Sequence, residues 1–98
     1  MSPDEGPIRV VVQIDLSAAD LDSFEAYESE VLELLEDHGA RLHVRLRGRD
    51  RPAEIHILSF PSRESRQNYL ADPRREMLQP LFKQSGAKSD IWEAVEPG

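Results

Sequence analysis

His43 and His56 are the residues of this chain whose side chains are best suited to chemistry near neutral pH. Each lies in a segment of alternating residue types, and the turn between the two segments would place the histidines opposite one another on an antiparallel hairpin. Such a pair, beside Arg45 and Glu54, could move a proton or hold an anionic or phenolic ligand. The alternative is a pair of interface or surface histidines whose hydrogen bonds are satisfied and which serve no reaction.

Metal and cofactor chemistry finds little support in the residues. His43, His56 and Glu54 would be a plausible set of metal ligands, but no compact ligand motif accompanies them, so we predict no metal. The chain has no cysteine, which excludes disulfides, thiolate nucleophiles and iron–sulfur clusters. Nucleophile motifs, phosphate loops and dinucleotide fingerprints are missing from the sequence, and we predict no cofactor.

Length and charge limit the partners. The 98 residues suffice for one domain, which we place at 8–98 after a flexible tail at 1–7. The net charge of -7 argues against nucleic acid, because binding a phosphate backbone depends on a basic surface. No apolar run approaches the roughly 20 residues that a membrane helix needs, and the acidic start does not resemble a secretory signal. We expect a cytoplasmic protein with no membrane contact.

The first half of the domain is predicted as a strand followed by a helix. Apolar residues occupy the even positions from Ile8 to Leu16, which is typical of a strand with one buried face. Apolar residues then recur at helical spacing from Leu21 until Gly39. Glu28 falls inside the apolar arc of that helix, where a carboxylate must reach water, pair with an arginine or take a raised pKa. We expect Glu28 to reach water or to pair.

Two further strands are predicted over 40–47 and 53–60, joined by a tight turn. We assign Ala40, Leu42, Val44, Leu46, Ala53, Ile55 and Ile57 to the face that the helices cover. Ser62 and Asp72 are expected to cap two more helices, Pro80 to kink or split the second, and Gly86 to close it. A fourth strand is predicted at 90–95, with its facing unclear.

This order of elements predicts an α+β domain of ferredoxin-like βαββαβ topology. Right-handed crossovers favour a four-stranded antiparallel sheet in the order 4-1-3-2, with the helices on one face. The open face would then carry charged side chains mixed with Val11, Leu58 and Phe60, a mixture that suits a surface covered by a partner. We therefore predict a homodimer whose two sheets pack through these three residues into an α/β barrel.

Short runs of the sequence carry a family resemblance. The run His38-Gly39-Ala40-Arg41, the segments 55–62 and 69–73 and the closing residues 95–98 resemble the dimeric α/β barrel superfamily. The likeness is closest to a branch of small uncharacterised bacterial proteins related to antibiotic-biosynthesis monooxygenases and EthD-like proteins. Ser59 stands where a glutamate is usual in that pattern, and the hairpin loop is shorter. The resemblance implies a ferredoxin-like dimer with a cavity between sheet and helices.

Together these features predict a protein that binds a small organic ligand in a pocket on the open sheet face, acting as a cofactor-independent monooxygenase or isomerase. The predicted ligand-binding residues are Gln13, His43, Arg45, Glu54 and His56. The alternative is a non-catalytic oligomerisation or accessory module, in which the same side chains only contact the other subunit. An enclosed cavity that contacts the histidines would favour the first reading.

Overall fold

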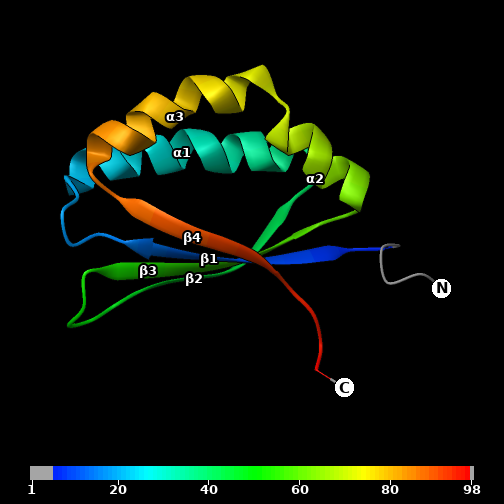
Figure 1. Cartoon of the computed structure of the whole chain (residues 1–98), viewed down its shortest axis with the longest axis horizontal. Coiled ribbons are helices and arrows are strands. Elements are labelled where there is room, and N and C mark those ends of the chain that lie inside the picture. The colour runs from blue at the N-terminus through cyan, green and yellow to red at the C-terminus, as the bar shows by residue number, and fades with distance from the viewer. Residues whose placement is uncertain (1–5, 98) are drawn as a thin grey trace.

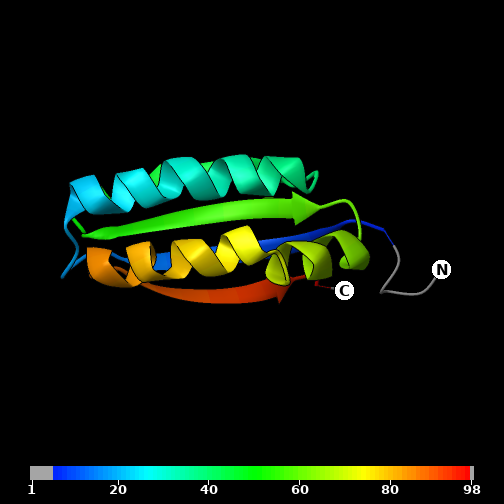
Figure 2. The ribbon, with the colours of Figure 1, turned by 90° about the horizontal axis from the view of Figure 1, so that it is seen from above.

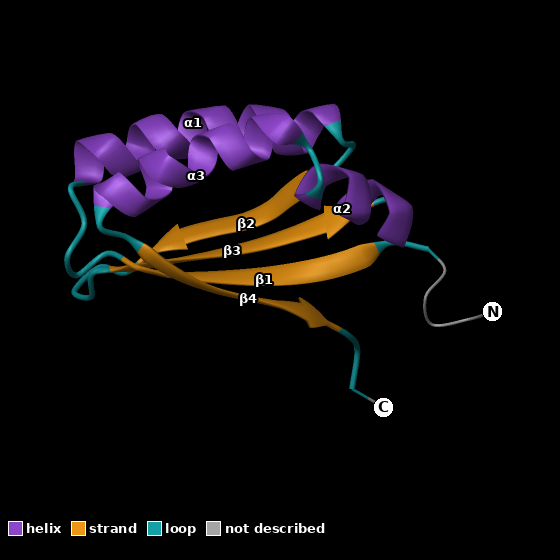
Figure 3. Cartoon of the chain, turned by 45° about the horizontal axis from the view of Figure 1, so that its top comes forward, coloured by secondary structure: helices purple, strands orange, loops and turns teal. Residues whose placement is uncertain are grey.

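The computed structural model describes residues 6–97, so most of the predicted tail at 1–7 lies outside the described residues. The elements follow one another as β1 (Ile8–Asp15), α1 (Leu21–Asp37), β2 (Arg41–Arg47), β3 (Ala53–Phe60), α2 (Arg63–Leu70), α3 (Pro73–Ser85) and β4 (Lys88–Ala94). The strands form one antiparallel sheet in the order β2-β3-β1-β4 (Figure 3). The three helices lie on one side of it (Figure 1), which confirms the predicted ferredoxin-like topology.

The helix ends follow from local chemistry. Ser62 and Asp72 cap α2 and α3 by accepting hydrogen bonds from the backbone N–H groups of Ser65 and Arg74. Gly86 closes α3 at φ +83°, and a Cβ there would lie 2.3 Å from the carbonyl oxygen of Ala18. Pro80 does not split the helix, which runs unbroken beside α1 (Figure 2).

The core lies between the helices and the even-numbered residues of β1. Ile8, Val10, Ile14 and Leu16 are buried as predicted, against Phe24 and Leu35 of α1 and Leu58, Phe60 and Ala87 elsewhere in the chain. A further cluster joins α1 to α3 through Val31, Leu34 and Leu78. Burial of these side chains is what holds the helices to the sheet.

The facing predicted for β3 is wrong. Leu58 is 5% exposed and Phe60 is 2% exposed, and both belong to the core rather than to an open face. The register explains this result, because Phe60 lies opposite Ile8 and Leu58 opposite Val10, and paired residues of an antiparallel ladder share a face. Glu54 and His56 therefore also face the helices, whereas Ile55 and Ile57 face away from them.

A β-bulge at His43 changes the facing within β2. The register shifts between Leu42 and Val44, so that Arg45 lies opposite His56 and Arg47 opposite Glu54 on the helix side. Val44 and Leu46 consequently point to the open face, contrary to the prediction. An alternation counted through the bulge assigns the wrong face to every residue after it.

The facing of β4 is settled by its pairing with β1. Ile91 lies opposite Val12 and faces the helices, whereas Trp92 lies opposite Val11 and faces away. The strand begins at Lys88, two residues before the predicted start. The open face of the sheet thus carries the apolar side chains of Val11, Val44, Leu46, Ile55, Ile57 and Trp92.

Candidate functional site

The structure separates the predicted ligand-binding residues into two groups. His43 lies on the open side, where its Nε2 is 2.7 Å from Ser59 Oγ, so it does not pair with His56. Gln13 lines a hollow of about 740 Å³ at one end of the open face. Arg45, Glu54 and His56 do lie on one face, but it is the face under the helices.

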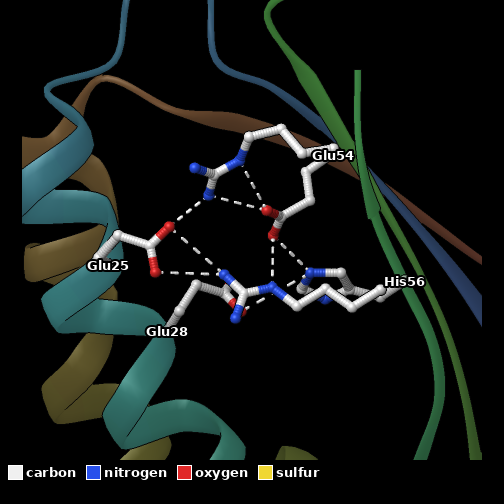
Figure 4. A network of polar contacts seen from close by, with 6 residues as sticks. Glu25, Glu28, Glu54 and His56 are labelled. Atoms are coloured by element: carbon white, nitrogen blue, oxygen red, sulfur yellow. Dashed lines mark hydrogen bonds and ion pairs between the residues drawn. The ribbon is translucent and has the colours of Figure 1, made fainter. Parts of the chain in front are cut away.

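Glu54 is the centre of a charged cluster at that buried face (Figure 4). Its side chain is 2% exposed, and it accepts hydrogen bonds from Arg45 Nε at 3.2 Å and from Arg47 Nη2 at 2.8 Å. The same two guanidinium groups pair with Glu25 of α1. Burial opposes ionisation of Glu54, yet the hydrogen bonds from His56, Arg45 and Arg47 outweigh it and lower the pKa of this carboxyl.

His56 lies between two carboxyl groups. Its Nε2 is 2.6 Å from Glu54 Oε2 and 3.8 Å from Glu28 Oε2. Because an ionised carboxylate only accepts hydrogen bonds, the short contact places a hydrogen on Nε2 that is donated to Glu54. His56 thereby fixes one end of the polar cluster next to Glu28.

Glu28 neither reaches water nor pairs with an arginine, contrary to the expectation from the sequence. It is 3% exposed, its Oε2 has no hydrogen-bond partner, and no arginine among residues 6–97 lies within ion-pair distance of it. Burial first, and then the negative charges of Glu54 and Glu25, raise the pKa of Glu28 from its usual 4.5 to about 7. Of the three possibilities for a carboxylate on the apolar side of this helix, the structure therefore shows the raised pKa.

The cluster offers donors to a metal ion as well as to a proton. Glu28, Glu54 and His56 each present one ligand atom, and these atoms lie within 4.8 Å of one another. However, both Glu54 oxygens already accept hydrogen bonds from guanidinium groups, so a cation would have to compete with two fixed positive charges. A proton on Glu28 displaces no existing contact, and we interpret the cluster as a proton-holding site.

Glu28 and His56 form part of the wall of a cavity of about 150 Å³ between the sheet and the helices. This volume is close to that of an engineered protein cavity that accommodates benzene. Apolar walls come from both layers, and besides Glu28 and His56 the polar lining is Tyr27, Arg66, Tyr69, Arg75, Gln79 and Ser89. Burial raises the pKa of both Tyr27 and Tyr69, which keeps their hydroxyl groups protonated. The cavity is thus an apolar, single-ring-sized space with an unpartnered carboxyl group on its wall.

The raised pKa of Glu28 predicts a specific dependence of stability on pH. The protonated carboxyl stabilises the fold fully below pH 4.5, and this contribution is lost as the pH rises through 7. Glu28→Gln stays neutral, so at pH 8 we expect it to exceed the wild type in free energy of unfolding by about 2 kcal/mol, below the ~3 kcal/mol ceiling that the pKa difference sets. Urea unfolding of both chains at pH 5 and pH 8 measures this gap.

At pH 5 the gap should shrink to about a quarter of its size at pH 8. The exposed Glu33→Gln on the same helix should show no such change with pH. A gap of the same size at both pH values would mean that Glu28 does not titrate between them. All other titrating groups are shared by the chains compared, so their contributions cancel.

No family model matches the chain, and no curated protein matches it. Within residues 6–97, no helix is both long and apolar enough to span a lipid bilayer.

Solved structures, in contrast, match over nearly the whole chain. SnoaB, a cofactor-independent oxygenase from Streptomyces nogalater, has a TM-score of 0.80 at 16% identity, with 96% of each chain covered. A candidate antibiotic biosynthesis monooxygenase from Caulobacter crescentus CB15 has a TM-score of 0.74 at 13% identity, covering 95% of this chain and 93% of that one. A NIPSNAP family protein with unknown function from Agrobacterium tumefaciens has a TM-score of 0.63 at 20% identity, covering 90% and 88%. At such low identities the likeness establishes the fold, and the chain has the ferredoxin-like fold of antibiotic-biosynthesis monooxygenase-like and NIPSNAP-like proteins.

Proposed function

We propose that this protein binds a small, weakly acidic organic compound in the cavity between sheet and helices, and that it acts as a cofactor-independent oxygenase or isomerase with Glu28 as its base. The observation that carries the proposal is the Glu28 carboxyl group, buried and unpartnered on the wall of that cavity beside His56. The proposed pocket therefore lies on the helix side of the sheet and not on the open face, and of the five residues predicted to bind the ligand only His56 lines it. The fold shared with an oxygenase that uses no cofactor supports the reaction class by analogy.

Glu28 suits proton abstraction from a phenol or an enol. A base works best when its pKa lies near the working pH, and the pKa of Glu28 is about 7. Removing the proton from the hydroxyl oxygen leaves an electron-rich anion, which an isomerase reprotonates on carbon. In an oxygenase, the CH₂ carbon of the keto tautomer loses two hydrogens, one atom of O₂ enters as a carbonyl oxygen, and the other leaves with both hydrogens as water.

The neighbours of Glu28 have positioning roles in this proposal. His56 Nε2 lies 3.8 Å from Glu28 Oε2 and donates its hydrogen to Glu54. Arg45 and Arg47 fix Glu54 in turn, so that the negative charge of Glu54 stays beside Glu28 and favours its protonated product state. Arg45, Arg47 and Glu54 keep Glu28 basic from outside the cavity, whereas His56 also lines it.

Ligand binding tests the proposal first. We expect single-ring phenols to raise the Tm of the wild type saturably at pH 7.5, and Glu28→Gln to weaken this binding about tenfold, because a hydrogen bond to a charged group is lost. Thermal-shift titrations, each referred to the ligand-free Tm of the same variant, measure both effects. Glu33→Gln, which removes the same charge from an exposed position of α1, should bind like the wild type.

If no phenol or enol shifts the Tm, or if Glu33→Gln loses as much affinity as Glu28→Gln, the ligand proposal fails. The non-catalytic oligomerisation module would then be the better reading. A specific observation favours that module as a second function, namely the apolar open face of the sheet.

We propose further that a second copy of the chain covers this open face. Leu46 is 62% exposed and Trp92 is 41% exposed on it, and Val11, Ile55 and Ile57 lie between them on the inner strands. An apolar sheet face of this kind is expected to be covered by another layer. The resemblance of the sequence to dimeric barrel proteins supports a twofold pair of sheets. Of the three residues predicted for this interface, Val11 remains, whereas Leu58 and Phe60 belong to the core.

A further inference from the structure

Arg75, the third residue of α3, is a charged group on the cavity wall that lies within hydrogen-bonding reach of the Tyr69 hydroxyl but has no oppositely charged partner among the described residues. Its Nε is buried and has no hydrogen-bond partner, and within residues 6–97 no carboxylate lies at ion-pair distance from its guanidinium. Its Cζ is 5.6 Å from the centroid of the Tyr69 ring, which leaves the plane of the group beside an aromatic surface. A buried N–H without an acceptor is costly and rare, so it calls for an explanation.

The other arginine on the cavity wall is different. Arg66 Nη1 is 2.6 Å from Glu93 Oε1, so its charge is already paired on β4. Arg75 also lies in the first turn of a 13-residue helix, where the helix dipole adds positive potential. Arg75 is therefore the group on the cavity wall that would stabilise a bound anion most strongly.

The cavity thus holds two groups of opposite sign, each with one buried atom that has no hydrogen-bond partner, and the two groups do not pair with each other. Glu28 on α1 can accept a proton, and Arg75 on α3 can hold an oxyanion through its fork of N–H donors. The lining between the layers is apolar and aromatic, with Tyr27 against Phe82 at 5.0 Å and Phe60 against Tyr69 at 5.6 Å between ring centroids. About 150 Å³ leaves room for one ring rather than a fused ring system.

We propose that the ligand is a single-ring organic acid whose carboxylate binds Arg75 and whose phenol or enol group reaches Glu28. This inference rests on the proposed function and adds the chemical class of the ligand to it. Arg75 acts here as a binding and specificity residue. It gives the carboxylate end of the ligand a fixed place and leaves the acidic hydroxyl to the base.

The experiment compares the acid with its ester. We expect 4-hydroxybenzoate or 3-hydroxybenzoate to bind the wild type at least about tenfold more tightly than the corresponding methyl ester, because the ester lacks the charge that a bidentate contact needs. Isothermal titration calorimetry at pH 7.5 measures the Kd values. Arg75→Gln should abolish the preference for the acid and leave the affinity for the ester nearly unchanged. Arg75→Lys should retain part of the preference.

Two controls separate this inference from the proposed function. Lys83→Gln removes a positive charge from the exposed side of the same helix and should keep the full preference. Glu28→Gln should weaken acid and ester alike and keep the ratio between them. Circular dichroism of each variant confirms that it folds.

If the ester binds the wild type as tightly as the acid, or if Arg75→Gln weakens both equally, the carboxylate does not bind Arg75 and the inference is overturned, while binding of neutral phenols would still uphold the proposed function. If neither acids nor neutral phenols bind, both the inference and the proposed function fail.

Discussion

Glu28→Gln is expected to lower kcat/KM about 100-fold or more for any phenol or enol that the wild type turns over. A glutamine of nearly the same shape fills the same place in the cavity wall but cannot accept a proton. The chemical step then has to rely on water or on a neighbour that is already engaged, since Glu54 has a lowered pKa and three hydrogen-bonding partners. Oxygen uptake with compounds selected by the binding panel, or NMR for an isomerisation, measures the rate.

The matched control is Glu33→Gln, which should keep the wild-type rate because its side chain lies on the exposed side of α1. The pH profile provides a readout that a loss of folding would not imitate. The wild-type kcat/KM should rise with pH through about 7, as Glu28 becomes ionised, and the residual rate of the variant should lack that rise. Full activity of the variant would remove Glu28 from the mechanism.

Phe60→Ala is expected to lower the free energy of unfolding by about 3–5 kcal/mol. Phe60 is nearly completely buried among Ile8, Val10, Leu35 and Leu58, and its ring packs against Tyr69. Truncation would remove its contacts and leave a void that the surrounding sheet and helices cannot fully close. Urea unfolding at a fixed protein concentration measures the loss.

Comparing Ile57→Lys with Phe60→Ala distinguishes a residue of the proposed dimer interface from a residue of the core. Ile57 is three residues earlier on the same strand but faces the open side, so a lysine there should leave the chain folded and convert a dimer into monomers, seen as a halved mass in light scattering. A small stability loss for Phe60→Ala combined with dissociation would restore Phe60 to the interface. A dimer that survives Ile57→Lys, or a wild type that is already monomeric, would contradict the proposed pairing of the sheets.

The sequence was sufficient for the topology because its strongest patterns are local. In β1 the apolar residues occupy one parity, and the alternative face carries Arg9, Gln13 and Asp15, so the facing could be assigned without knowing the partner strands. The helix caps at Ser62 and Asp72 and the left-handed Gly86 were likewise recognisable from residue types. Short connections and right-handed crossovers then leave few arrangements.

The facing of β2 and β3 could not be obtained in the same way. Both parities of β3 contain apolar residues, with Ile55 and Ile57 on one and Leu58 and Phe60 on the other, and only the register with β1 decides between them. The bulge at His43 has no sequence signature and reverses the facing of the residues that follow. The buried polar cluster is stable because four charged side chains and His56 satisfy one another, a condition that exists only after folding.

The candidate site was only partly visible in the sequence. Glu28 could be singled out from its place in an apolar helical arc, but its lack of a partner depends on where Arg45 and Arg47 point. Arg75, Tyr27 and Gln79 carry no motif, and they meet in one cavity because α1 and α3 pack side by side over the sheet. Tyr69 packs against Phe60, as a core residue does, yet it also lines the cavity.

The most direct test of the account is the place where a single-ring phenol binds, observed by methyl NMR during a titration. The account predicts saturable shifts of the methyl groups of Val12, Val31, Leu35 and Leu58, which line the cavity between sheet and helices. The methyl groups of Val11, Val44, Ile55 and Ile57 on the open face should stay unchanged. Saturable shifts confined to the open-face methyl groups, beside the hollow that contains Gln13, would contradict it.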